Sequence, residues 1–357
     1  MRPLLSSKIP GVSLASPSSQ VRRGFAGLFS LVIFYVCYSC KPGRRSGVSL
    51  FEPASSSLDE HKINAEGKDG TTCWIEYYTD PLCSWCWAFE AQWRHLCYEC
   101  AERLQWHYRM GGLIANWRGY DDPFNAIQNP AQMGPQWFQV REFSGMPLDE
   151  KIWHSDPPGS SYPACLAVKA AERQGPAIAE QYLRRLREAV MLERRNIARQ
   201  EILLAAAQEV KQIPSQEEQF DLDRFRADLN APETVEAFRQ DLRDAAYYGI
   251  GRFPTLILRR NNGRSLILVG YRPYDALCAA VDSLVPDIRQ KHALPREDLI
   301  VDYVQQWRSA TVHELAEVLG EQLDQTSQLL NALIVQKKLK LANDSPGRTP
   351  LYIPIPD

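Results

Sequence analysis

Two cysteines, Cys83 and Cys86, lie three positions apart in the segment Asp-Pro-Leu-Cys-Ser-Trp-Cys-Trp, which runs from Asp80 to Trp87. Thiols at this spacing lie one turn apart on the same face of a helix, so they can form a disulfide and reopen it. A predicted strand precedes them, and Asp80-Pro81 ends it. The predicted helix begins at Cys83, where unpaired N–H groups and the helix dipole favour a thiolate. The pattern predicts thiol–disulfide exchange, with Cys83 attacking and Cys86 able to resolve the mixed disulfide.

The chain has nine cysteines, at positions 37, 40, 73, 83, 86, 97, 100, 165 and 278. A zinc site at the motif would need a second pair or histidine ligands, and Cys97 and Cys100 are the best local candidates. They fall late in the predicted helix, so we interpret them as buried thiols, with an accessory redox pair as the alternative. Cys165 is interpreted as a core cysteine, with a partner thiol as the alternative, and Cys73 and Cys278 as core residues. No metal or other cofactor is expected.

Two residues outside the motif are expected to complete the site. Glu76 lies in the strand before the motif, among aromatic residues, where a buried acid is costly unless it has a function. We expect it to accept a proton from Cys86, the alternative being that it points to solvent. Pro254 follows Phe253 at the entrance of a predicted strand, where a cis peptide bond would be a deliberate feature. Trp85 and Phe253 are the expected substrate contacts.

The surrounding elements predict an α/β domain over residues 71–290. Strands are expected at 72–79 and 104–110, on either side of a helix from Cys83 to Ala101. A helical insertion is predicted at about 117–248, with turns over 121–160 and then helices at about 162–174, 177–192, 196–211, 221–228 and 232–247. The Asn-Gly step before Ser265 predicts a hairpin of strands at 255–260 and 265–269, followed by a helix at 273–284.

These features carry a family resemblance. Cys83-Ser-Trp-Cys86 after a strand, the helical insertion and Phe253-Pro254-Thr255 resemble the DsbA-like branch of the thioredoxin superfamily. Within that branch, the chain looks most like the FrnE-like oxidoreductases and the related ClpXP adaptors. This likeness rests on the form of the motif, on Ser160-Ser-Tyr-Pro-Ala-Cys165 and on Glu193-Arg-Arg-Asn196. The resemblance covers about residues 71–285.

The resemblance implies a thioredoxin fold with a large helical insertion. It implies Cys83 as nucleophile, Cys86 as resolving thiol, Pro254 as a cis-proline beside them and Glu76 as the buried strand acid. Ser84-Trp85 differs from the Pro-His pair of periplasmic DsbA, so the strongly oxidising potential of that protein cannot be carried over.

The N-terminal segment differs in charge from the rest of the chain. Residues 1–45 hold seven cations and no acid, so a formal net charge of −2 leaves −2 − 7 = −9 for the remainder. The net negative charge of the residues after position 45 argues against nucleic-acid binding. The apolar run at 24–40 is compatible with an uncleaved anchor that associates with a membrane, a secretory or lipoprotein signal, or an upstream extension of the gene model. Residues 46–70 are interpreted as a linker.

Residues 295–357 predict three helices, at about 296–307, 311–319 and 323–336, and then two strands joined by a turn at 343–349. We interpret them as a C-terminal winged-helix-like module. Six lysines or arginines against nine acids at 296–357 make DNA binding unexpected, so a protein partner or dimerisation is the preferred role.

The expected function is a protein-disulfide oxidoreductase or isomerase acting on protein or small-molecule thiols and disulfides. The alternative is a redox-sensitive protein-binding adaptor of the proteolysis type, without turnover. Glutathione-transferase kappa relatives share the helical insertion but typically lack the cysteine pair. The several unpaired cysteines favour a reducing location, cytoplasmic or membrane-anchored, with export as the alternative.

Overall fold

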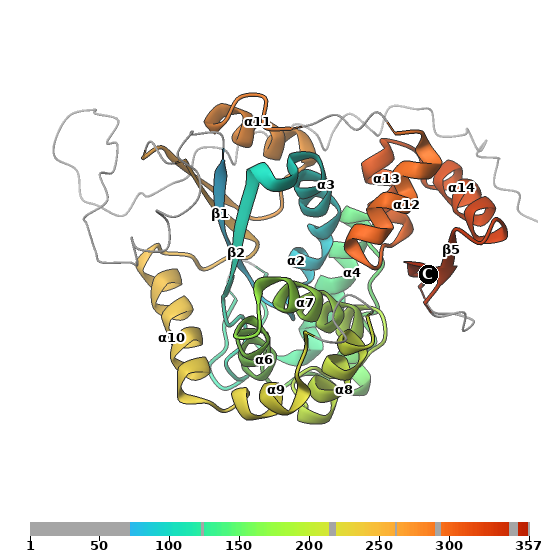
Figure 1. Ribbon diagram of the computed structural model, residues 1–357. Helices are drawn as coiled ribbons and strands as arrows, with labels where there is room; N and C mark the ends of the chain where they lie inside the picture. Colours follow the sequence, from blue (N-terminus) through green and yellow to red (C-terminus); the bar gives the residue numbers. More distant parts are fainter. Residues whose placement is uncertain are drawn as a thin grey trace, which may run out of the picture. The chain divides into compact units, whose positions relative to one another are not determined.

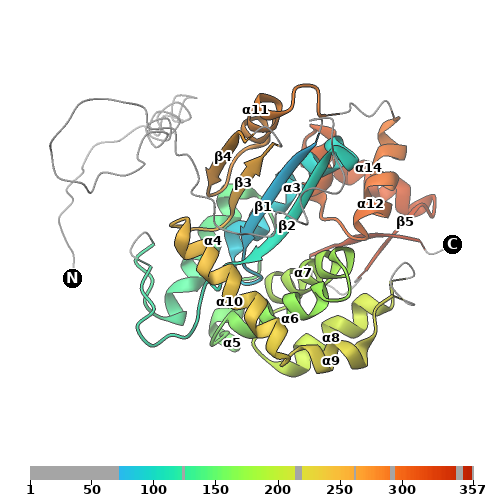
Figure 2. The same ribbon diagram turned by 60° about the vertical axis from the view of Figure 1, so that its left-hand side comes forward.

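A four-stranded sheet carries the redox motif. The computed structural model of the 357-residue chain describes residues 72–122, 125–213, 219–260, 263–289, 294–342 and 349–355. The strands are β1 (Cys73–Thr79), β2 (Leu104–Met110), β3 (Thr255–Arg259) and β4 (Ser265–Val269), in the order β2-β1-β3-β4. β1 pairs parallel with β2 and antiparallel with β3, and β4 completes the hairpin (Figure 2). The predicted strands are all present.

The motif helix packs on one face of this sheet. It consists of α2 (Ser84–Ala88) and α3 (Glu90–Cys100), which meet at Phe89, so the single predicted helix is interrupted. Tyr77 of β1 points toward it, and its ring lies edge-on to those of Phe89 and Trp93, with centroids 6.0 and 5.1 Å apart. Large buried aromatic side chains therefore fix the motif against the strand that precedes it.

The insertion between β2 and β3 is helical, as predicted. Its later helices are α6 (Tyr162–Glu172), α7 (Pro176–Met191), α8 (Gln200–Lys211), α9 (Leu222–Asp228) and α10 (Pro232–Tyr247). The prediction of turns over 121–160 was wrong in part, because α4 (Met133–Ser144) and the short α5 (Ile152–Ser155) lie there. Pro135 stands in the first turn of α4, where a missing N–H costs little.

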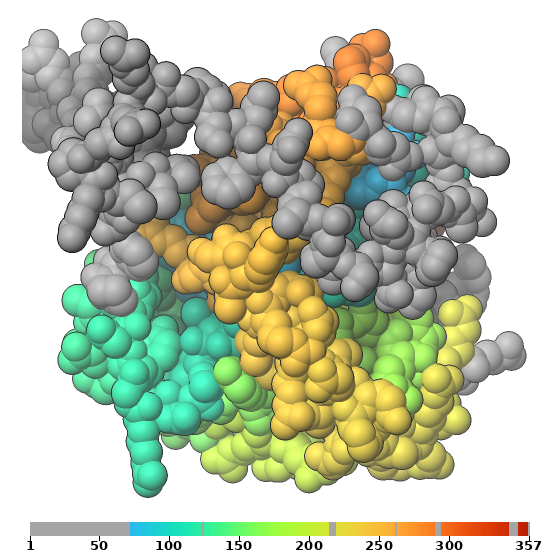
Figure 3. Space-filling model, turned by 90° about the vertical axis from the view of Figure 1, so that its left-hand side faces the viewer, coloured from blue at the N-terminus to red at the C-terminus, as the bar shows by residue number. Residues whose placement is uncertain are grey.

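α10 packs against the opposite face of the sheet, and Figure 3 shows it running across that side of the molecule. Its Asp241 accepts a hydrogen bond from the backbone N–H of Met110 at 2.9 Å and pairs with Arg109 at 3.2 Å. Tyr78 of β1 clusters on this face with Ala245. Successive residues of β1 therefore point alternately to α3 and to α10.

The C-terminal segment shares a core with the motif helix. After α11 (Tyr274–Leu284) the chain forms α12 (Arg296–Trp307), α13 (Val312–Leu319), α14 (Leu323–Val335), and the antiparallel strands β5 (Leu339–Leu341) and β6 (Tyr352–Pro354). Figure 1 shows α13 beside α3. The ring of Tyr98 in α3 lies 5.2 Å from that of Tyr303 in α12. The helices agree with the prediction, whereas the winged-helix interpretation stays a prediction.

Several expectations fall outside the described residues. They are the leader, anchor or extension at 1–45, with Cys37 and Cys40, the linker at 46–70 and most of the turn at 343–349. Across the part of the chain that the structure describes, no helix combines the length and the apolar character needed to cross a bilayer. The expected membrane association at 24–40 and the expected location therefore stay predictions.

Candidate redox-active site

The two motif cysteines lie where β1 gives way to α2. Cys83 is the N-cap of α2, and its Sγ accepts the backbone N–H of Cys86 at 3.2 Å. Both carry free thiols. Cys83 is 5% exposed and Cys86 0%, so an external disulfide can reach only the sulfur of Cys83. The expected order of attack, Cys83 before Cys86, stays a prediction.

The loop before β3 closes over Cys83. The Phe253–Pro254 peptide bond is cis, as expected. The Sγ of Cys83 lies 3.7 Å from the carbonyl oxygen of Phe253, and the backbone N–H of Gly270 donates to the Pro254 carbonyl at 2.7 Å. The structure thus brings the two expected loop residues to the accessible sulfur.

Gly111 leaves the space that the Phe253 ring occupies. A Cβ at this position would lie 2.0 Å from Cζ of Phe253, so the ring would have to move. We expect Gly111→Ala to displace the Phe253–Pro254 loop and to slow disulfide exchange by about tenfold or more, because reacting groups tolerate little misplacement. Exchange with glutathione disulfide measures the effect. Gly159→Ala is the control, since a Cβ there meets nothing within 4 Å, and equal rates for the two variants would contradict this role of Gly111.

The expected role of Glu76 is not supported by the structure. Its carboxylate faces the α10 side of β1, where it pairs with Arg109 and Arg259, each at 3.0 Å. Tyr77 and Thr79 point to the other face, toward the motif helix. Because side chains alternate along a strand, Glu76 and the motif cysteines lie on opposite sides of the sheet. Glu76 is an ion-pair partner within the α10 face, and not the proton acceptor of Cys86.

The charged side chain that lies near Cys86 is Arg187 of α7, and not Glu76. Arg187 is 1% exposed and hydrogen-bonds Thr79 Oγ1 through Nη2 and Glu90 through Nη1. Burial raises the pKa of the Cys86 thiol, but the hydrogen bond with Cys83, the charge of Arg187 and the hydrogen bond with Thr79 outweigh it and lower the pKa below its usual value. Arg187 was not among the residues that we expected at the site from the sequence.

The pKa of the Cys83 thiol differs from the prediction when both cysteines are reduced. Burial raises its pKa, and the neighbouring Cys86 sulfur raises it further, so the expected lowering by the helix start is not found. The two sulfurs titrate as a pair, and the negative charge of the pair is favoured on Cys86. A proton passed from Cys83 to Cys86 would make the accessible sulfur the attacking thiolate.

Asp80 anchors the chain just before the motif. Its carboxylate is fully buried and accepts hydrogen bonds from the N–H groups of Leu82 at 2.8 Å and Leu113 at 2.7 Å. Ser161 Oγ also donates to it at 2.8 Å, and Cys165 Sγ lies 3.3 Å away. Burial raises the pKa of Asp80, against these hydrogen bonds. Cys165 is therefore held in the core by Asp80, and the motif loop is tied to the end of β2 and to α6.

The remaining described cysteines lie in the core. Cys73, Cys97, Cys100 and Cys278 are all buried, and burial raises the pKa of each thiol. Among the residues that the structure describes, no cluster of three or more His, Cys, Asp or Glu side chains has the geometry to hold a metal ion. Cys97 and Cys100 thus have the surroundings of structural thiols.

Aromatic side chains cluster around Trp85 of the motif. Trp85, inside the motif, lies 5.4 Å from the ring of Phe143 and 6.0 Å from that of Tyr271. Phe143 is 57% exposed, a large value for a phenylalanine. The sequence predicted a substrate contact at Trp85 but not at Phe143 or Tyr271, because neither lies near the motif in the chain. Together the three offer an apolar surface next to the site.

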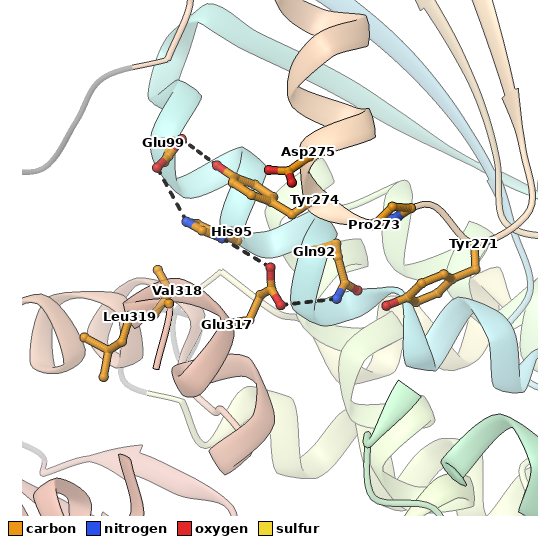
Figure 4. A pocket seen from close by; sticks show the side chains of 11 residues that line it. Gln92, His95, Glu99, Tyr271, Pro273, Tyr274, Asp275, Glu317, Val318 and Leu319 are labelled. Atoms are coloured by element: carbon orange, nitrogen blue, oxygen red, sulfur yellow. Dashed lines mark hydrogen bonds and ion pairs between the residues drawn. The ribbon is translucent and has the colours of Figure 1, made fainter. Parts of the chain in front are cut away.

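A pocket of about 550 Å³ adjoins this surface, between α3, the start of α11 and the end of α13. Figure 4 shows its polar lining, in which Glu99 bonds to His95 and Tyr274, and Glu317 to His95 and Gln92. None of the motif cysteines lines it. The pocket therefore borders the site without containing the reactive sulfurs.

A family model described as thioredoxin matches residues 77–278, more than half of the 357-residue chain. The chain belongs to the thioredoxin family. The expected fold, a thioredoxin fold with a large helical insertion, is confirmed. Among curated proteins, the chain is similar to the ClpXP adapter protein SpxH of Halalkalibacterium halodurans, with 26% identity over 80% of this chain and 90% of that one. The SpxH protein of Bacillus subtilis is 25% identical over 74% of this chain and 84% of its own length.

Solved structures also resemble this thioredoxin-family chain. The cytosolic disulfide reductase DsbM from Pseudomonas aeruginosa has a TM-score of 0.46 and 23% identity, over 59% of this chain and 97% of that one. DsbA2 from the same organism has a TM-score of 0.36 and 17% identity, over 61% of this chain and 91% of that one. These likenesses are weak, and the family assignment rests on the family model.

Proposed function

We propose that this thioredoxin-family protein is a thiol–disulfide oxidoreductase or isomerase that reacts through Cys83 and Cys86. The observation that carries the proposal is the pairing of one accessible sulfur with one buried sulfur at the start of α2, under the Phe253–Pro254 loop. Protein or small-molecule disulfides are the substrates, and the apolar surface of Trp85, Phe143 and Tyr271 would receive the chain of a protein substrate.

Turnover tests this proposal directly. The full-length protein is expected to accelerate reduction of insulin by a small dithiol, monitored as turbidity from the released chains. A variant in which both cysteines are serine serves as the blank, since it lacks both reactive sulfurs. A rate equal to the blank, both with insulin and in refolding of a scrambled-disulfide protein, would rule out the oxidoreductase function.

The second candidate is a redox-sensitive adaptor, supported by the SpxH relatives, whose names state that they are ClpXP adapters. This function predicts that the chain binds ClpXP and increases proteolysis of a client protein. Binding that is unchanged when both cysteines are serine, together with no turnover of insulin, would favour the adaptor. Binding that differs between the dithiol and disulfide forms would combine the two functions.

A further inference from the structure

Two buried side chains, Thr79 and Arg187, lie beside the sulfur of Cys86. Thr79, at the end of β1, is 0% exposed and hydrogen-bonds that sulfur. Arg187 donates through Nη2 to the Oγ1 of Thr79. Because the threonine oxygen accepts from the guanidinium, its single hydroxyl proton is free to point to the sulfur. The arrangement is a relay of two hydrogen bonds from a fixed cation to Cys86.

Two buried donors at this place have no partner among the described residues. They are the Nε of Arg187 and the hydroxyl of Tyr77. The charges of both motif cysteines act on Tyr77, and that of Cys86 acts on Arg187. Buried donors left unpaired are costly, so their presence indicates a site prepared for an anion. A thiolate is the anion that this chain itself can place there.

Arg187 is held in place by packing and by charge. One turn earlier in α7, the guanidinium of Arg184 lies 4.6 Å from the ring of Trp87, which seats α7 against α2. The Nη1 of Arg187 faces Glu90, whose carboxylate offsets part of its charge, while Nη2 faces Thr79. Other ionisable groups near Cys86 in the described part of the chain include Cys83, the N-cap of α2, Tyr77 in β1 and Asp80 directly after β1.

We propose that Arg187, acting through the Thr79 hydroxyl, is a positioning residue that holds the Cys86 sulfur as a thiolate and so speeds resolution of the mixed disulfide. The inference rests on the proposed exchange function and names the step that Arg187 serves. In the first step the Cys83 thiolate attacks a substrate disulfide, and one substrate thiolate leaves. In the second, the Cys86 thiol loses its proton to that leaving thiolate or to water.

The resulting Cys86 thiolate then attacks the Cys83 sulfur. The Cys83–Cys86 bond forms, the bond from Cys83 to substrate breaks, and the second substrate sulfur leaves with the electron pair and takes a proton from water. One substrate disulfide is thereby reduced to two thiols while the cysteine pair is oxidised. Cys86 is fully buried and the relay is aimed at its sulfur, so the relay acts on the second step.

The two steps can be timed separately with dithiobis(nitrobenzoate), an aromatic disulfide whose thiolate product absorbs visible light. Attack by Cys83 releases the first product and attack by Cys86 the second. We expect Arg187→Met to slow the second phase at neutral pH by about tenfold or more, because loss of an opposing charge raises a thiol pKa by about 1–3 units. The rate of the second phase should also rise more steeply with pH in this variant, between about pH 5 and about pH 9.

Four further variants make the test specific. Thr79→Val removes only the hydroxyl and should slow the second phase by about threefold or more, whereas Arg187→Lys keeps the charge and should restore part of the rate. Arg185→Met is the matched control on α7, since Arg185 pairs with Glu193 and Glu209 away from the cysteines. The absorbance change of the Cys83→Ser variant comes from thiols outside the site, and it is subtracted from that of every other variant.

The outcomes separate this inference from the proposed function. If the first phase is present and the second is unchanged in both Arg187→Met and Thr79→Val, the role of Arg187 is refuted. If the unmodified protein shows no first phase, the exchange function itself fails. Should Arg187→Met not fold by circular dichroism, Thr79→Val and Arg187→Lys decide the question, because both keep the volume of the site nearly constant.

Discussion

Replacing Glu314 by glutamine is expected to lower the free energy of unfolding by about 3–5 kcal/mol, because it leaves buried cations without their counter-charge. Glu314 is 0% exposed. Its Oε1 lies 3.0 Å from Nη1 of Arg94 and 2.9 Å from Nη1 of Arg184, and its Oε2 lies 2.9 Å from Nη2 of Arg184. The carboxylate therefore joins α13 of the C-terminal segment to α3 and α7, the two helices beside the redox motif. Urea unfolding followed by circular dichroism measures the loss.

The stability that Glu314 provides should depend on pH. Burial raises the pKa of its carboxyl, and Arg184 and Arg94 more than offset this, so the pKa in the folded protein is about 2. The unfolded value is about 4.3. A carboxyl whose pKa is lower in the folded state stabilises the fold fully above its unfolded pKa, and this contribution is lost as pH falls from about 4.3 toward about 2. In Glu314→Gln, this part of the fall in the free energy of unfolding at low pH should be absent.

Glu321→Gln is the matched control on the same segment. Glu321 pairs with Arg296, whose side chain is 56% exposed, so solvent weakens the pair. We expect a change of less than about 1 kcal/mol, as for other exposed ion pairs. Equal destabilisation by the two variants would contradict the assigned role of Glu314. It would also mean that the C-terminal segment contacts α3 less closely than the buried charges indicate.

The elements of the fold could be predicted because their signals are local. The helices of the insertion show apolar positions at helical spacing, and the motif strand ends at a proline. α4 was missed because the prolines and tryptophans of residues 121–160 suggested turns, although Pro135 belongs to the first turn of a helix. The separate character of residues 295–357 was inferred from their pattern, but a pattern does not show against which helix a new face packs.

The candidate site was only partly predictable for the same reason. Cys83, Cys86 and Pro254 stand in local contexts that indicate their roles. Strand alternation puts Glu76 and Tyr77 on opposite faces, but the sequence does not say which face the motif helix covers. Arg187 is 108 residues from Thr79 in the chain, so only tertiary packing brings them together.

A weak signal for the arginines was nevertheless present in α7. Helical spacing places Arg184 and Arg187 on one face with Met191, an apolar residue that is fully buried in the structure. Arginines on the apolar face of a helix cannot both reach water. Because a buried charge is costly without a counter-charge, they require buried acids as partners. Glu90 and Glu314 supply these acids from segments far apart in sequence, and this non-local pairing is what the sequence alone could not show.

Cys86→Ser is expected to arrest the reaction at a mixed disulfide on Cys83, with loss of turnover of at least about a hundredfold, because attack from within the site is far faster than attack by an external thiol. Dithiobis(nitrobenzoate) should release one equivalent of product from the site and then stop. Intact-mass spectrometry should show a single adduct, and peptide mapping should place it on Cys83.

Cys83→Ser provides the opposite outcome from the same site. The remaining sulfur of Cys86 is 0% exposed, so the substrate cannot reach it and no adduct should form there. Cys165 cannot substitute as the resolving thiol, because it is fully buried, held 3.3 Å from Asp80, and has a pKa raised well above its usual value by burial and by that acid. Undiminished turnover in Cys86→Ser would therefore contradict the role of Cys86 as the resolving thiol, whereas an adduct on Cys86 in Cys83→Ser would reverse the order of attack. The asymmetry between the two serine variants thus tests the burial difference on which the proposed mechanism depends.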